Sequence, residues 1–150
     1  MVRTMCEILF RGEDVETGAW VKGFYVCLNG NEHRIYSGYA ETDCGDYYPD
    51  WFKVDPDTVG EFTGLYNAAG QMIFDGDIVK FNEKKYVVQR EDETPGGSWS
   101  CTAYILQEVG VDGGLSFEDT IDEYCNEICV EIIGNIHDNP ELLEGGAVDG

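Results

Sequence analysis

The chain has 150 residues, of which 43% are hydrophobic and 13% aromatic, and it carries a formal net charge of −21 at pH 7. The length fits one ordinary domain, and the aromatic content excludes a disordered acidic chain. The charge excludes polyanions and anionic membranes as favoured partners. Residues 91–150 contain no Lys or Arg and fifteen acidic residues, a charge of 0 − 15 = −15. We therefore expect no membrane association and no direct binding to nucleic acid.

In the first half of the chain, short apolar runs alternate with turn signals. Strands are predicted at residues 6–10, 20–28 and 33–39, and Asn29-Gly30 predicts a type I′ hairpin turn between the last two. An acidic, aromatic loop is predicted at 41–49 and a short strand at 51–54. Within that strand Trp51 and Phe52 are expected in the core. Asp55-Pro56 predicts a single helical turn.

The second half of the chain predicts further short strands. Residues 62–81 are expected to form strands with tight turns at 67–70 and 75–77. Residues 78–81 and 86–90 are expected to form a hairpin with a four-residue loop. After a polar break at 91–97, further strands are expected in 98–109 and in 130–134. Ser116 and Asp119 resemble a capping box, which predicts a helix over about residues 117–127. Asn139-Pro140 predicts a short terminal helical turn. The predicted fold is mainly β, with small irregular sheets or a barrel-like arrangement and one or two short helices near the C-terminus.

The start of the chain bears on its location. The segment MVRTMCEILFRGED lacks the apolar region and cleavage site of a secretion signal, and no run approaches the roughly eighteen apolar residues of a membrane span. The six cysteines would suit a disulfide framework in a secreted protein. Without a secretion signal, we expect free thiols and a cytoplasmic protein.

Several runs of sequence are similar to those of a known family. They are ILFRGEDVETGAWVKG (8–23), VDPDTVGEFTGL (54–65), GQMIFDGDIVKF (70–81) and EIIGNIHDNPELL (131–143). In this order the chain resembles the YopX-like family of bacteriophage and prophage proteins, whose function is uncharacterised. The resemblance implies a mostly β fold, a phage or prophage origin in the cytoplasm of a bacterial host, and no known catalytic residues. We expect a single YopX-like domain over 1–150, with two β subdomains and a break near 91–97 as the alternative.

Residues that suit metal binding are scattered along the chain. Cys125, Cys129 and His137 form a C-x3-C-x7-H pattern that would start a zinc site, but a fourth ligand is missing nearby. Oxygen-rich loops around Asp75 and Asp77, and around Asp43, Asp46 and Asp50, do not match a calcium loop. We therefore predict no metal site and no cofactor.

The sequence contains no recognisable catalytic motif. Only His33 and His137 offer an imidazole base, and neither a GxSxG nucleophile motif nor a phosphate-binding glycine loop is present. We predict no catalytic residues and a protein that is not an enzyme. A metal-dependent phage enzyme that uses the acidic loops stays open as an alternative.

The expected partner contacts are aromatic side chains near turns and carboxylates of the acidic half. They are Tyr47, Tyr48, Trp99, Glu118, Asp119, Asp122 and Glu123. The only basic cluster expected is Lys80, Lys84, Lys85 and Arg90, which is too small to offset the net charge for nucleic-acid binding. We therefore predict a non-enzymatic module that binds a host or phage protein through an acidic face, or binds itself as a homo-oligomer. A nucleic-acid mimic that occupies a host DNA-binding protein is the alternative.

Overall fold

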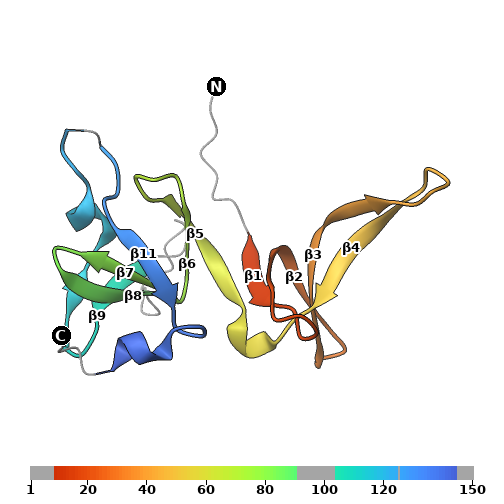
Figure 1. Ribbon diagram of the computed structural model, residues 1–150, viewed down its shortest axis with the longest axis horizontal. Coiled ribbons are helices and arrows are strands. Elements are labelled where there is room, and N and C mark those ends of the chain that lie inside the picture. The colour runs from red at the N-terminus through yellow and green to blue at the C-terminus, as the bar shows by residue number, and fades with distance from the viewer. Residues whose placement is uncertain (1–8, 91–103, 125, 145–150) are drawn as a thin grey trace, which may run out of the picture. The chain divides into compact units, whose positions relative to one another are not determined.

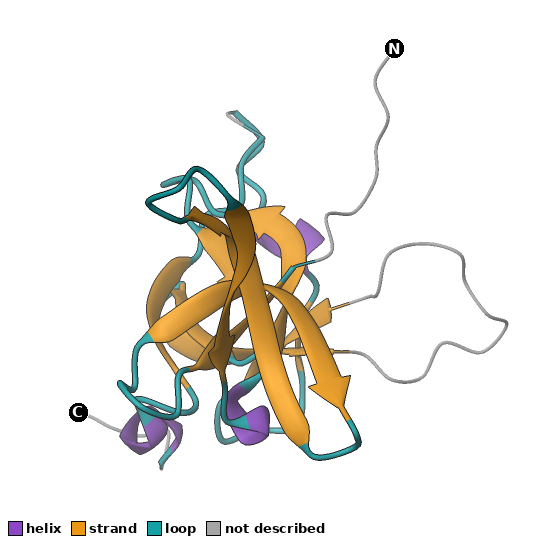
Figure 2. Ribbon diagram, turned by 90° about the vertical axis from the view of Figure 1, so that its right-hand side faces the viewer, coloured by secondary structure: helices purple, strands orange, loops and turns teal. Residues whose placement is uncertain are grey.

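A computed structural model describes residues 9–90, 104–124 and 126–144. These residues form two antiparallel sheets, and the helices among them are 3-10 turns of three or four residues (Figure 2). Among these residues we find no helix that could span a membrane. The mainly β prediction with short helical turns near the C-terminus is confirmed. The predicted polar break at 91–97 lies outside the described residues.

The chain divides into two compact units, residues 1–62 (unit 1) and 63–150 (unit 2). The strand orders are β4-β3-β2-β1-β5-β6 and β10-β9-β8-β7-β11, and β5 passes from unit 1 into unit 2. The elements, labelled in Figure 1 where there is room, are β1 (Phe10–Glu13), β2 (Trp20–Leu28), β3 (Glu32–Glu41), β4 (Tyr47–Lys53), η1 (Pro56–Thr58), β5 (Gly60–Tyr66), β6 (Met72–Phe74), β7 (Asp77–Phe81), β8 (Lys84–Arg90), β9 (Tyr104–Glu108), β10 (Gly114–Leu115), η2 (Phe117–Thr120), β11 (Glu131–Asn135) and η3 (Pro140–Leu143).

Two hairpins dominate unit 1. Between β2 and β3, Asn29 and Gly30 both have positive φ, 55° and 77°, which confirms the predicted type I′ turn. The second hairpin joins β3 to β4, and Figure 1 shows its far end extending beyond the other strands of the unit. The loop predicted at 41–49 is shorter than expected, because β4 already begins at Tyr47, which pairs with Glu41.

The core of unit 1 lies on one side of these strands. Ile35 and Val54 are 0% and 2% exposed. A Cβ on Gly12 would lie 3.2 Å from side-chain atoms of Ile35, Val54 and Val59, so glycine lets β1 pack closely on this core. The Thr58 hydroxyl accepts a hydrogen bond from the Glu13 N–H and donates one to the Asp55 carbonyl, which ties the predicted helical turn η1 to β1.

Two predictions in unit 2 are wrong in detail. The loop between β7 and β8 has two residues rather than four, because Asn82 and Glu83 adopt positive φ of 52° and 67° and Lys84 already pairs with Phe81. The helix predicted at 117–127 ends at Thr120, although its capping box is present. Beyond η2 the Asp122 carboxylate instead accepts a hydrogen bond from the Tyr124 N–H, which competes with helix formation.

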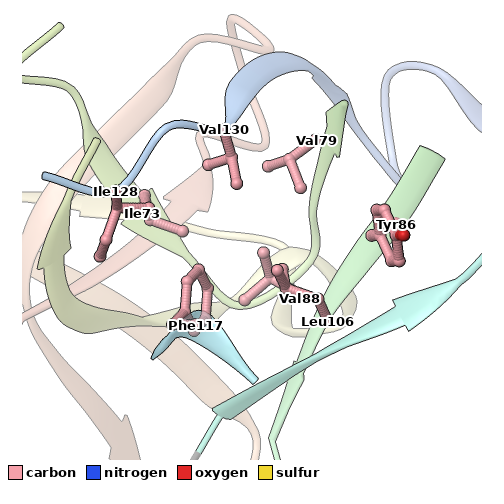
Figure 3. Packing of buried hydrophobic residues seen from close by; sticks show 8 residues of the cluster. All are labelled: Ile73, Val79, Tyr86, Val88, Leu106, Phe117, Ile128 and Val130. Atoms are coloured by element: carbon pink, nitrogen blue, oxygen red, sulfur yellow. The ribbon is translucent and has the colours of Figure 1, made fainter. Parts of the chain in front are cut away.

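The core of unit 2 is a cluster of buried side chains from both halves of the unit. Figure 3 shows them gathered from β6, β7, β8, β9, η2 and the chain before β11: Ile73, Val79, Tyr86, Val88, Leu106, Phe117, Ile128 and Val130. Burying one such aliphatic or aromatic side chain stabilises a fold by about 1.5–3 kcal/mol. The cluster therefore stabilises unit 2 despite the negative charge of residues 91–150.

Candidate protein-binding surfaces

One face of the unit 1 sheet carries aromatic and cationic side chains in two adjacent rows. In the first row Phe24 lies opposite Tyr36, which lies opposite Trp51. In the second row Val26 lies opposite Arg34, which lies opposite Lys53. Side chains on one face of a sheet recur at every second residue, so both rows share a face. We call these six residues of β2, β3 and β4 the cation–aromatic face.

Arg34 is at the centre of the cation–aromatic face. Its guanidinium lies 3.7 Å from the centroid of the Trp51 ring, a cation–π contact. It also donates hydrogen bonds of 2.9 Å to the Tyr36 hydroxyl and 2.8 Å to the Glu32 carboxylate. The bond to Tyr36, with that to Glu32, raises the pKa of Arg34, so its charge is permanent. The aromatic rings and the guanidinium are thereby held in one arrangement.

The exposure of this face corrects two predictions. Trp51 is 39% exposed and Phe24 is 64% exposed, so the prediction that Trp51 belongs to the core is wrong. Phe52 points to the opposite face and is half-buried. Arg34 and Lys53 are cross-strand neighbours, so the cluster around Lys80 is not the only basic one. The signal was present in the sequence as the alternation of Glu32, Arg34 and Tyr36 and of Trp51 and Lys53.

A second surface is formed by η2 and the chain that follows it, residues 117–124 and 126–127, which we call the acidic loop. Buried Phe117 and Thr120 anchor its start, and the Thr120 hydroxyl donates to the Phe117 carbonyl. A backbone bridge between Ile121 and Ile128 closes its base. Figure 1 shows this part of the chain extending away from the sheet of unit 2. Near the tip Tyr124 is 98% exposed.

The four carboxylates predicted as partner contacts lie in the acidic loop and have two different roles. Asp119 accepts hydrogen bonds from the N–H and the hydroxyl of Ser116, and Asp122 accepts one from the N–H of Tyr124. These two carboxylates hold the shape of the loop. Glu118 and Glu123 are exposed. The loop therefore presents an aromatic tip between carboxylates.

The remaining predicted contacts lie elsewhere. Tyr47 is 71% exposed at the start of β4, and Tyr48 pairs with Ala40 in the same hairpin. Trp99 lies outside the described residues. The lysine-rich cluster follows the β7–β8 hairpin, where Lys80 pairs with Lys85 and the Lys84 ammonium lies 3.9 Å from a carboxylate oxygen of Glu108. These contacts stay predictions.

A cleft of about 570 Å³ in unit 1 is lined in part by Glu13, Asp14, His33, Lys53 and Asp55. The Nδ1 atom of His33 hydrogen-bonds the hydroxyl of Tyr25, and the two rings stack. Burial raises the pKa of Tyr25, which keeps its hydroxyl neutral. No Ser, Thr or Cys is found among the described residues that line the cleft. The cleft thus combines one histidine, whose hydrogen-bond partner is the Tyr25 hydroxyl, with carboxylates and Lys53.

Two of the residues considered for metal binding have local contacts in the structure. Cys129 is exposed and its thiol lies 3.5 Å from the Glu127 carbonyl, while Cys125 is not among the described residues. Asp77 is buried and accepts a hydrogen bond from the Phe74 N–H, which holds the turn before β7. Within the described ranges no three His, Cys, Asp or Glu side chains come together as a metal site.

Comparisons with known proteins identify a family and a structural neighbour. A solved structure, the crystal structure of protein EF1440 from Enterococcus faecalis, is 20% identical with a TM-score of 0.48, and the match covers 93% of this chain and 100% of that one. A comparison with curated proteins gives no match. The family model described as YopX protein matches residues 9–144. This match confirms the resemblance seen in the sequence, and the chain belongs to the YopX protein family.

Proposed function

We propose that this protein is a small, non-enzymatic protein-binding module of phage or prophage origin that acts in the cytoplasm of a bacterial host. The acidic loop is the surface that engages its protein partner. The observation that carries this proposal is the exposure of Tyr124, which is 98% exposed among the carboxylates of its own loop. The resemblance to the YopX-like phage proteins supports the origin.

The chemistry of the acidic loop suits a protein partner. A tyrosine supplies a large contact area at a low entropic cost, and aromatic side chains dominate binding energy in protein interfaces. Ile121, which is 38% exposed, adds apolar area at the base of the loop. The carboxylates of Glu118 and Glu123 speed association with a partner of opposite charge and exclude acidic ones.

Nucleic-acid mimicry is a second candidate function for the same acidic residues. A mimic needs a dense array of free carboxylates that reproduces a phosphate backbone. Asp119 and Asp122 instead accept hydrogen bonds from their own loop. The exposed aromatic tip also has no counterpart in a phosphate backbone. These two features favour a protein interface over mimicry.

Affinity capture tests the proposal. The tagged protein is incubated with a bacterial host lysate at low and high salt, and the retained proteins are identified by mass spectrometry. Tyr124→Ala should lose the retained partner, whereas Tyr66→Ala, which changes another exposed tyrosine of unit 2, should keep it. Equal capture by both variants would contradict a role for the acidic loop. Release of the partner by competing DNA would favour mimicry instead.

A further inference from the structure

We infer that the acidic loop of one copy binds the cation–aromatic face of a second copy of this chain. The inference rests on the proposed function, because it names the partner of the acidic loop. Each chain then carries both halves of the interface. Such a head-to-tail contact closes into a ring when the rotation between copies allows it and forms an open chain when it does not.

The cation–aromatic face has the composition of a protein-binding hot spot. Trp, Tyr and Arg are the residues most enriched at such sites, and here Tyr36, Arg34 and Trp51 are direct neighbours. The ring centroids of Tyr36 and Trp51 are 6.3 Å apart, and the guanidinium of Arg34 stacks on Trp51. Because these groups already hold one another, little side-chain freedom is lost when a partner binds.

The acidic loop offers the complementary groups. Tyr124 supplies a ring that can stack against Phe24 or Trp51, both of which are exposed. Glu118 and Glu123 supply carboxylates for Lys53, which is exposed at the edge of the aromatic row. Aromatic surface thus meets aromatic surface, and carboxylates meet a cation.

The distribution of charge favours this occupant over a polyanion. Residues 63–150 contain four cationic and eighteen acidic residues, a charge of 4 − 18 = −14. In unit 1, Arg34 and Lys53 form a local basic spot, and Glu32 neutralises part of its charge through the ion pair with Arg34. So small a basic area cannot hold an extended phosphate backbone close to a chain of net charge −21. It can hold a loop that brings only a few carboxylates.

A charge-reversal experiment tests the inference. Lys53→Glu places a carboxylate on the face, and Glu123→Lys places an ammonium on the loop. Either variant alone brings like charges together at every contact, so its average mass in sedimentation velocity should fall toward that of a monomer. An equimolar mixture restores opposite charges at every contact between unlike copies and should recover the wild-type mass. Lys80→Glu and Glu141→Lys make the same charge changes at exposed positions elsewhere and should leave the mass unchanged.

Three results would overturn the inference. A monomeric wild type at all concentrations would exclude a second copy as the partner. Assembly that neither single variant weakens would exclude these two surfaces. Binding of a labelled single-stranded oligonucleotide that Trp51→Ala abolishes would assign the face to nucleic acid. If capture of a host protein still depends on Tyr124 in any of these cases, the proposed function stands while the inference fails. Failure of the inference can therefore be distinguished from failure of the proposed function.

Discussion

Asn67 is the side chain whose removal should most clearly expose how unit 2 is held together. It is 6% exposed, and its amide nitrogen donates to the Gln71 side chain and to the Val130 carbonyl, 63 residues along the chain. Its amide oxygen accepts from the N–H groups of Ala69 and Gln71. One side chain therefore shapes the β5–β6 turn and joins it to the residue that directly precedes β11.

The cost of Asn67→Ala follows from these four hydrogen bonds. Each contributes a net 0.5–1.5 kcal/mol in typical proteins, so we expect a loss of about 2–6 kcal/mol in the free energy of unfolding. Urea unfolding followed by circular dichroism measures it. Asn31→Ala, at an exposed asparagine of a hairpin turn, is the matched control and should cost less than about 0.5 kcal/mol. Equal stabilities of the two variants would refute this role of Asn67.

A second substitution separates the two halves of the Asn67 amide. Asn67→Asp keeps an acceptor for the two N–H groups but replaces the donor to the Val130 carbonyl by a carboxylate oxygen. At neutral pH it should destabilise about as much as Asn67→Ala. When the pH falls and the carboxyl group is protonated, it can donate again, so stability should partly return. A variant without this gain at low pH would contradict the assigned hydrogen bonds.

Three further predictions follow from the core, the ionisation of a buried tyrosine and a turn. Leu106→Ala, at a residue that is 0% exposed, should cost about 2–5 kcal/mol by urea unfolding, and a cost below about 1 kcal/mol would show a loosely packed cluster. Burial, with the nearby charge of Glu108, raises the pKa of Tyr86 above 10.0, so its stabilising effect is present below pH 10 and is lost as the pH rises through the raised pKa. Wild type should therefore lose stability relative to Tyr86→Phe above about pH 10, and a constant difference would refute this. Gly30→Ala, at a φ of 77°, should cost about 1–2 kcal/mol, and an unchanged midpoint would show that the turn adapts.

The sequence predicted those elements whose signals are local. Strand β2 has the predicted bounds, and Asn29-Gly30 forms the predicted turn because positive φ is cheap for these two residues. Ser116 and Asp119 form the predicted capping box. The length of the helix after it was not predictable in the same way. Its end depends on hydrogen bonds of the Thr120 and Asp122 side chains to the backbone, which compete with helix geometry.

Only one of the two candidate surfaces could be predicted from the sequence. The carboxylates of the acidic loop follow directly from composition, but the cation–aromatic face depends on the register of three strands. Tyr36 and Trp51 are neighbours because the pairing register of β3 and β4 shifts between Tyr36 and Gly38. No local sequence motif predicts this shift. The local pattern therefore predicts a core position for Trp51, although this residue is 39% exposed and lies beneath Arg34.

The mass of the protein in solution shows whether the acidic loop of one copy binds the cation–aromatic face of another. Sedimentation velocity would be run on the wild type, Tyr124→Ala and Trp51→Ala across micromolar concentrations. We expect a wild-type mass that rises above the monomer with concentration and a lower mass for both variants, with circular dichroism spectra unchanged. A wild type that stays monomeric throughout, or variants that assemble as the wild type does, would contradict it.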